Sequence, residues 1–132
     1  MVLVRWYTAA MLCVDAYELY RLWTASPRTL SNGSCWFDAR SNAPMAPALF
    51  TTLLLCLTLP RIFVLIEPLS RWILMLETIH DALRVVLYSA LFTVNEDASQ
   101  INTILITIAL WNVFFYGRSY YTTMLMLREN SK

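Results

Sequence analysis

Four ionisable residues lie close together in an otherwise apolar stretch of this chain: Glu77, His80, Asp81 and Arg84. An α-helix turns by about 100° per residue, so all four share one face within an arc of about 100°, and Tyr88 falls inside that arc. Their spacing predicts pairing of His80 with Glu77 or Arg84, and of Asp81 with Arg84. Such a row has two chemical interpretations. It is a proton relay if hydrated, or a structural polar network that fixes helices against one another.

Other chemistry finds little support in the residue types. Glu77-x-x-His80 has the spacing of di-iron bundles, but the chain has one histidine, so only a site shared by a homodimer stays open. A haem with two histidine ligands is excluded within one chain for the same reason. The three cysteines form no C-x-x-C pair, and we find no glycine-rich phosphate loop or nucleophile–base motif. We therefore expect no catalytic residue, no metal and no cofactor, with a bound phospholipid as an open possibility.

The composition is that of a membrane protein. The chain has 132 residues, of which 58% are hydrophobic and 14% charged, against about 25% charged in soluble domains. A net charge of +1 without a basic patch argues against nucleic acid as a partner. We predict an all-α polytopic membrane protein that forms a single domain over residues 1–132. Its four transmembrane helices are expected at about 6–23, 45–66, 72–94 and 101–121, with a polar loop over 24–44.

The third predicted span organises the others. Each ionisable group costs about 2.5–3.5 kcal/mol at the middle of a bilayer, so its polar stripe must face protein or water. The short turn at Pro68–Arg71 makes spans two and three an antiparallel hairpin. Pro60 should kink the second span near its end. The neighbouring Arg61 either extends to the membrane surface or pairs with the stripe, and both interpretations stay open.

The first predicted span is the least apolar. Asp15 and Glu18 are three residues apart on one face, so spanning requires them to turn inward, where Arg61 or Arg84 could pair with them. The alternative is an amphipathic helix at the membrane surface. The two acids interrupt the apolar run, so we expect a retained span rather than a cleaved signal peptide. We assign the aromatic residues at the ends of the first span, Trp6, Tyr7, Tyr20 and Trp23, to belts at the membrane surface, and place Tyr120 and Tyr121 at the surface end of the fourth span. The aromatic cluster of the fourth span, which includes Tyr116, is assigned to packing and to a belt.

The loops give two further expectations. Trp36 and Phe37 form a lone apolar patch in the polar loop and are predicted to contact a partner or the membrane surface. Four spans place both termini on one side, and the distribution of arginine and lysine favours the cytosol or the mitochondrial matrix for that side.

The chain resembles a known family, the four-span membrane scaffold of ergosterol biosynthesis in the endoplasmic reticulum. The resemblance rests on Arg5-Trp6, on Asn32-Gly33, on Arg61 followed by Glu67, and on His80 followed by Tyr88. It departs from the family before span two, where only the Phe of an Ala-Arg-Thr-Phe-Gly signature is kept, as Phe50. Arg84 also replaces a glutamate, and the connection between spans two and three is shorter. The resemblance implies a non-catalytic scaffold.

These observations lead to three functional hypotheses. The first is a non-catalytic accessory subunit of a mitochondrial inner-membrane complex, either respiratory or ATP synthase, whose partners are other integral membrane subunits and lipids. The departures from the scaffold family favour it over the second, an endoplasmic-reticulum scaffold that tethers sterol-biosynthesis enzymes. The third is a proton or ion pathway. The residues assigned to the intramembrane network are Asp15, Glu18, Arg61, Glu77, His80, Asp81, Arg84 and Tyr88.

Overall fold

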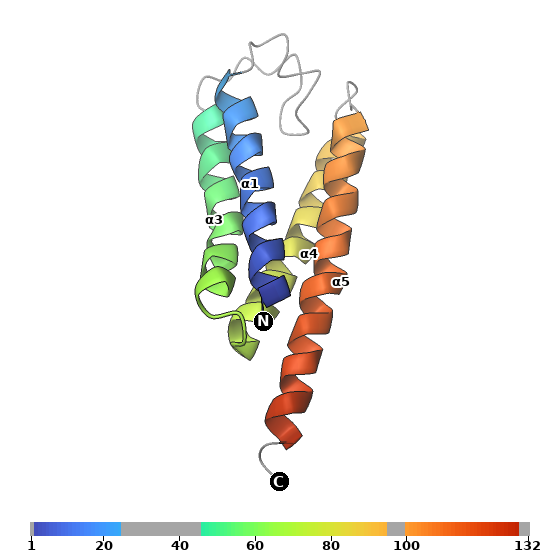
Figure 1. Cartoon of the computed structure of the whole chain (residues 1–132). Coiled ribbons are helices and arrows are strands. Elements are labelled where there is room, and N and C mark those ends of the chain that lie inside the picture. Colours follow the sequence, from blue (N-terminus) through green and yellow to red (C-terminus); the bar gives the residue numbers. More distant parts are fainter. Residues whose placement is uncertain (1, 25–45, 95–99, 130–132) are drawn as a thin grey trace.

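The structure, a computed structural model, describes residues 2–24, 46–94 and 100–129. These residues form α1 (Val2–Thr24), α3 (Ala46–Ile66), α4 (Arg71–Val94) and α5 (Gln100–Glu129), and no strand occurs among them. The helices run alternately up and down, so that both ends of the chain lie at the same end of the bundle (Figure 1). The all-α prediction is confirmed.

The predicted boundaries agree within a few residues for three helices. α5 differs, because it ends at Glu129 rather than near 121. We interpreted the sequence around Gly117 and Arg118 as the point where the fourth span reaches the membrane surface. No proline follows, and the apolar segment Met124–Leu127 continues the helix. The final turns of α5 therefore project beyond the other helices (Figure 1).

α1 packs along α3, and α4 packs along α5. Hydrogen bonds join α1 to α3 near both ends of the pair. Trp23 Nε1 donates to Thr51 Oγ1 at 2.8 Å, and Arg5 Nη2 donates to the Ile66 carbonyl oxygen at 3.3 Å. These contacts tie α1 to α3 at positions that flank the middle of the bundle.

A tight turn joins α3 to α4 and makes them antiparallel, as predicted for the second and third spans. The Ser70 amide donates to the Glu67 carbonyl oxygen at 3.2 Å, and the Leu74 amide donates to the Ser70 carbonyl oxygen at 3.0 Å as α4 begins. Pro60 lies inside α3, which continues through it to Ile66. The residue after this proline, Arg61, is thereby presented to the interior from a continuous helix.

The apolar core consists of two small clusters at different levels of the bundle. One is built on Leu22, Leu54 and Tyr88, and the other on Val64, Leu74 and Tyr116. Between them the interior is polar and charged. Among the described residues, the buried polar and charged side chains are Thr8, Asp15, Glu18, Thr58, Arg61, Glu77, Asp81, Arg84, Asn112 and Thr123.

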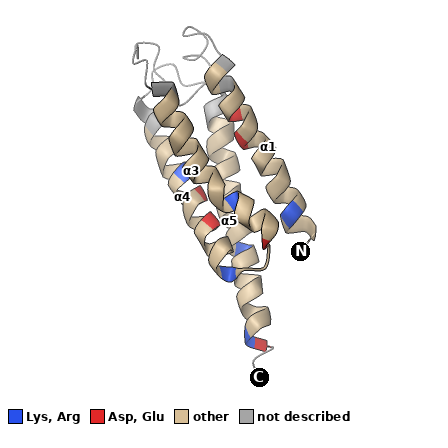
Figure 2. Ribbon diagram, turned by 90° about the vertical axis from the view of Figure 1, so that its left-hand side faces the viewer, with Lys and Arg blue, Asp and Glu red and all other residues tan. Residues whose placement is uncertain are grey.

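One helix in the described part of the chain, α3, is long and apolar enough to cross a membrane on length and composition. Its segment Ala48–Ile66 has a mean hydropathy of 2.2. The other three predicted spans stay predictions. In α1 and α4 the residues that lower hydropathy include Asp15, Glu77 and Arg84, all of which face the interior. A ribbon coloured by charge shows that acidic and basic residues occur within the helices and not only at their ends (Figure 2).

Candidate functional site

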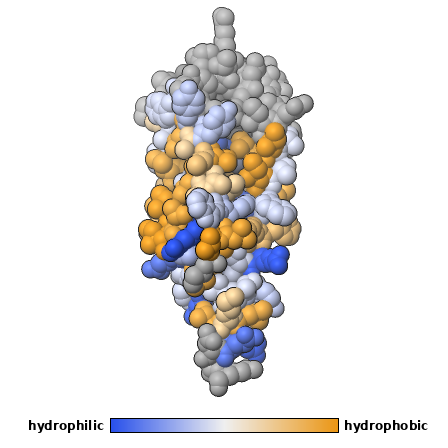
Figure 3. Space-filling model, in the orientation of Figure 1, coloured by the Kyte–Doolittle hydropathy of each residue, from blue (hydrophilic) through white to orange (hydrophobic). Residues whose placement is uncertain are grey.

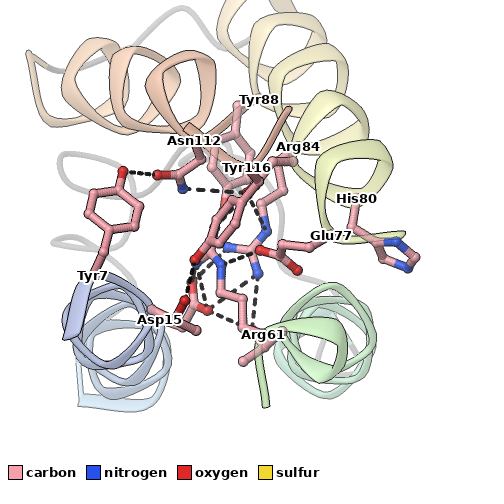
Figure 4. Close-up of polar contacts among 12 residues, drawn as sticks. Tyr7, Asp15, Arg61, Glu77, His80, Arg84, Tyr88, Asn112 and Tyr116 are labelled. Atoms are coloured by element: carbon pink, nitrogen blue, oxygen red, sulfur yellow. Dashed lines mark hydrogen bonds and ion pairs between the residues drawn. The ribbon is translucent and has the colours of Figure 1, made fainter. Parts of the chain in front are cut away.

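Arg61 of α3 is the centre of a buried network (Figure 4). Its side chain is 2% exposed, and its guanidinium faces three carboxylates. Nε donates to Glu77 Oε1 at 2.8 Å, and Nη1 donates to both oxygens of Asp15 at 2.7 and 2.8 Å. Nη2 donates to Asp81 Oδ1. Buried guanidinium and carboxylate groups need this kind of complete pairing to offset their loss of hydration. One side chain thus connects α1, α3 and α4.

Arg84 of α4 supplies the second positive charge. Its Nη1 donates to Asp15 Oδ1 at 2.6 Å, and its Nη2 donates to Thr58 Oγ1 at 3.1 Å. The Thr58 hydroxyl in turn donates to Asp15 Oδ2 at 3.0 Å. Asp15 therefore accepts hydrogen bonds from both arginines, which makes it the main link from α1 to the hairpin of α3 and α4.

Asn112 brings α5 into the network. It is fully buried between Tyr7 and Arg61. With the amide oxygen turned to Arg61, that oxygen accepts a hydrogen bond of 2.8 Å from Nη2, and the amide nitrogen donates to the Tyr7 hydroxyl. The opposite orientation would direct the amide NH₂ at the guanidinium NH₂, two groups that can only donate. All four described helices therefore contribute to one set of polar contacts.

Two further pairs extend the network towards the two apolar clusters. The Tyr88 hydroxyl donates to Glu18 at 3.0 Å, next to the apolar cluster that contains Leu22 and Leu54. The hydroxyls of Thr8 and Tyr116 lie 2.9 Å apart, next to the apolar cluster that contains Val64 and Leu74. Each tyrosine ring packs in an apolar cluster while its hydroxyl reaches the polar layer. The polar and apolar parts of the interior are thus joined through the same side chains.

The structure brings seven of the eight residues assigned to the network together: Asp15, Glu18, Arg61, Glu77, Asp81, Arg84 and Tyr88. Of the two interpretations of Arg61, the structure shows the paired one. Asp15 and Glu18 face inward, as spanning by the first helix requires.

His80 is placed differently from its predicted pairing with Glu77 or Arg84. Its Nδ1 lies 2.8 Å from the Leu76 carbonyl oxygen of its own helix, and the ring points away from the network (Figure 4). The physical reason is its position on the helix. The buried face of α4 is centred between Glu77 and Asp81, because Leu74 and Tyr88 on that side are buried as well. Counted from Glu77, Asp81 lies about 40° to this side and His80 about 60° to the other. His80 therefore lies outside the face that the neighbouring helices cover.

Sequence reasoning missed Tyr7, Thr8, Thr58, Asn112 and Tyr116 as members. Tyr7 is predicted in an aromatic belt and Tyr116 in a cluster that serves packing and a belt; in the structure both hydroxyls make interior contacts. The ring of Tyr7 also stacks on Phe115, with ring centres 3.9 Å apart. The signal that could have found Asn112 is its position as an amide in the middle of an apolar segment. The proposed contact residues Trp36 and Phe37 lie outside the described residues.

The network contains more acid than base. It holds four carboxyl groups (Asp15, Glu18, Glu77 and Asp81) and two guanidiniums (Arg61 and Arg84), an excess of two acidic groups. Three buried atoms have no hydrogen-bond partner among the described residues: Glu77 Oε2, Asp81 Oδ2 and Arg84 Nε. The Arg84 Nε atom lies 3.7 Å from Asp81 Oδ1, which is an ion pair without hydrogen-bond distance. Buried polar atoms without a hydrogen bond are uncommon in folded proteins, and excess charge in a buried layer is costly.

A small cavity adjoins the network. Its volume is about 10 Å³, and Asp15, Glu18 and Asn112 are among its lining residues. This is about the volume that one water molecule requires, and the lining offers the several polar partners that a buried water needs. Within the described ranges, no group of three or more His, Cys, Asp or Glu side chains is arranged to hold a metal ion.

Comparisons of this chain with models of known protein families, with curated proteins and with solved structures find no match. The resemblance to the ergosterol-biosynthesis scaffold therefore stays a prediction based on the residues quoted above.

Proposed function

We propose that all four helices are embedded in a membrane and that the chain acts there as a non-catalytic subunit of a larger assembly. The observation that carries the proposal is the distribution of polarity. Among the described residues, ten buried side chains are polar or charged and eight are hydrophobic. The outer surface shows the reverse, because large apolar side chains are exposed on every described helix, and several apolar groups lie on the face drawn in Figure 3. Water disfavours such an arrangement, whereas hydrocarbon favours it.

The same distribution accounts for the modest hydropathy of α1 and α4. Their central charged residues, including Asp15, Glu77 and Asp81, are directed into the bundle and would not meet lipid. Their outward positions are apolar, as at Leu83 of α4 and Val2 of α1. Charged residues within spans are tolerated when they face other helices and pair there. These two helices therefore fit a membrane better than their average composition suggests.

A role in assembly follows from the outer surface. The side chains of Trp6, Trp111 and Phe114 are 73%, 63% and 73% exposed. Large aromatic residues at the surface of a rigid bundle suit contact with other integral membrane subunits. The network contributes by holding the four helices in one register, so that this surface is presented in a fixed form. We favour a mitochondrial inner-membrane complex, respiratory or ATP synthase, over a sterol-enzyme scaffold of the endoplasmic reticulum.

The experiment that tests this proposal is a native-gel separation of membranes solubilised in mild detergent, with mass spectrometry of the band that contains the untagged protein. Co-migration with a respiratory or ATP synthase assembly is the expected result. Co-migration with sterol-modifying enzymes would transfer the proposal to the second setting. A free monomer, or recovery in the soluble fraction without detergent, would contradict the proposal altogether.

A second candidate function is proton transfer. The observation that favours it is the excess of two carboxyl groups over guanidiniums, next to a cavity that fits about one water molecule. A buried layer of this kind either holds protons or carries a net negative charge, and the first is less costly in a medium of low dielectric. The test is proton flux into liposomes that contain the purified protein. Flux that Glu18→Gln abolishes, in a protein that stays folded, would support conduction. The absence of flux above that of empty liposomes would leave the network a structural role.

A further inference from the structure

Two of the orphaned atoms of the buried network lie on neighbouring acidic side chains. Glu77 and Asp81 are one turn apart on α4, and residues at this spacing are neighbours on the surface of a helix. Neither side chain has any exposed area. Each has one oxygen, Glu77 Oε2 and Asp81 Oδ2, without a hydrogen-bond partner among the described residues. Two adjacent buried carboxyl groups that share this feature call for a common explanation.

Arg61 brings the two carboxyl groups together. Its Nε donates to Glu77 Oε1 at 2.8 Å, and its Nη2 donates to Asp81 Oδ1. Nε and Nη2 form one edge of the guanidinium, an edge that can bind a single carboxylate through two parallel hydrogen bonds. Here two carboxyl groups meet it instead. Two ionised carboxylates that share a buried site repel each other, and such pairs hold a proton between them.

The described side chains offer no further donor to the orphaned oxygens. Every nitrogen of Arg61 already donates, since Nη1 donates to Asp15 and Nη2 also donates to the Asn112 amide oxygen. The Nε atom of Arg84 is the remaining buried donor, and it lies 3.7 Å from Asp81 Oδ1 without a hydrogen-bond partner. The two guanidiniums therefore leave both oxygens unsatisfied.

A proton satisfies both oxygens at once. The small cavity beside the network, which fits about one water molecule, is lined by neither Glu77 nor Asp81. A protonated carboxyl group carries one O–H donor. One added proton therefore turns one orphaned oxygen into a donor and makes the other its acceptor. With one carboxyl group neutral, three carboxylates face two guanidiniums, so the excess of acidic groups falls from two to one.

We propose that Glu77 and Asp81 form a proton-binding site, in which Glu77 is a neutral carboxylic acid at neutral pH and its O–H donates to Asp81 Oδ2. Glu77 holds the proton because Asp81 has an ion pair with Arg84 in addition to its pair with Arg61. The proton is resident and is not relayed, which separates this site from the conduction considered above. The site follows from burial and pairing alone, so it does not depend on the membrane location of the chain.

Infrared spectroscopy of the purified full chain tests the site. The C=O stretch of a protonated carboxyl group is separate from the stretches of carboxylates and amides, and it shifts when deuterium replaces the proton. We expect this band in the wild-type protein at neutral pH and expect Glu77→Gln to remove it. Glu18→Gln changes another buried carboxyl group of the network and should leave the band of Glu77 in place. The absence of the band from the wild-type protein, or its persistence in Glu77→Gln, would overturn the proposal.

Thermal unfolding gives a second measurement. Glutamine has the shape of a protonated glutamate, and its amide can donate to Asp81 while its oxygen accepts from Arg61. We therefore expect Glu77→Gln to unfold at the wild-type temperature or above it. The matched control is Asp15→Asn. Both oxygens of Asp15 accept from guanidinium groups, so an amide NH₂ there would face donors and lower the unfolding temperature. Equal losses in the two variants would contradict a protonated Glu77.

The proton also makes the stability depend on pH. An unfolded chain releases the glutamate proton at a pH of about 4.3, so at neutral pH the folded protein holds one proton more, and its stability falls as the pH rises. In Glu77→Gln this contribution is absent, and we expect the unfolding temperature to vary less with pH. The other charged or titratable described side chains around the pair stay in place in this variant: Tyr7 and Asp15 of α1, Arg61 of α3, Arg84 of α4 and Tyr116 of α5. An equal dependence on pH in the two proteins would show that Glu77 holds no proton.

Discussion

The middle of this bundle is polar and charged and its outer surface is largely apolar, which is the opposite of the distribution in a water-soluble protein. Glu77 and Asp81 have no exposed area in the interior, whereas Trp6 and Phe114 are 73% exposed on the outside. In water, burying the charges would cost free energy through desolvation, and exposing the aromatic rings would forgo the gain from burial. In hydrocarbon the same arrangement is favourable in both places. The comparison between the interior and the outer surface therefore supports the proposed membrane location, in which the surrounding hydrocarbon favours the side chains that face outward.

Arg61 gives the sharpest test of the interior. Arg61→Met would leave the carboxylates of Asp15, Glu77 and Asp81 without their shared partner. Removing one member of a buried ion pair costs about 3–5 kcal/mol. We expect the variant to lose most of its folded, monodisperse fraction in mild detergent, as measured by size-exclusion chromatography and thermal unfolding.

The control for this experiment removes charge from both sides of the network. Combining Arg61→Met with Glu77→Gln and Asp81→Asn should recover part of the lost stability, because fewer uncompensated carboxylates remain and Asp15 keeps Arg84 as its partner. Unfolding at the wild-type temperature by the single variant would contradict the central role of Arg61.

The outer surface is tested at Leu83, which is 52% exposed near the middle of α4. In a membrane, Leu83→Arg places a charge against lipid, which costs about 2.5–3.5 kcal/mol. We expect less protein to insert and more to be extracted by alkali than for the control variant Leu83→Ala. In a water-soluble bundle the same change at a surface position would alter stability by only about 0.5 kcal/mol. Full insertion of Leu83→Arg would therefore contradict the proposal that this part of the outer surface faces lipid.

Helical periodicity in the sequence correctly predicted which charged residues of α1 and α4 share a buried face. Asp15 and Glu18 were placed on one face by their spacing, and Glu77, Asp81 and Arg84 by theirs; the structure turns all five inward. Periodicity gives the arc that the polar residues occupy, but it does not show which part of that arc a neighbour covers. Asp81 and His80 lie at opposite ends of the predicted arc, and the buried face includes the end with Asp81 and leaves His80 outside the network.

The contributions of Tyr7, Thr58 and Asn112 depend on which helices are neighbours and at what height. A single polar residue in the middle of an apolar helix indicates a buried position, but it has no periodic partner, so the sequence does not show which side chains it contacts. The extension of α5 to Glu129 was missed for a different reason. Gly117 and Arg118 indicated the membrane surface, but a helix can continue through such a boundary when no proline follows.

Within the interior, the contact between Tyr88 and Glu18 should matter less than the ion pairs. Tyr88→Phe keeps the ring in its apolar cluster and removes only the hydroxyl that donates to the carboxylate. Hydrogen bonds between membrane helices contribute about 0.6 kcal/mol on average and up to about 1.7 kcal/mol. We expect a destabilisation in that range by thermal unfolding in detergent. Tyr121→Phe, at a residue that is 63% exposed, serves as the control and should leave the unfolding temperature unchanged.

His80 lies between the two regions and should show the smallest effect. Within the described part of the chain, its ring makes one polar contact, with a backbone carbonyl of its own helix, and it points away from Arg61 (Figure 4). We expect His80→Ala to change the stability by no more than about 0.5 kcal/mol. Glu77→Ala, one turn earlier on the same helix, removes an acceptor from Arg61 and should destabilise the bundle far more. Because both changes shorten a polar side chain of α4, their difference isolates the effect of facing the network. Equal losses in the two variants, measured by thermal unfolding in the same detergent, would show that His80 turns inward and that the polar layer is wider than the contacts of Arg61 and Arg84 define.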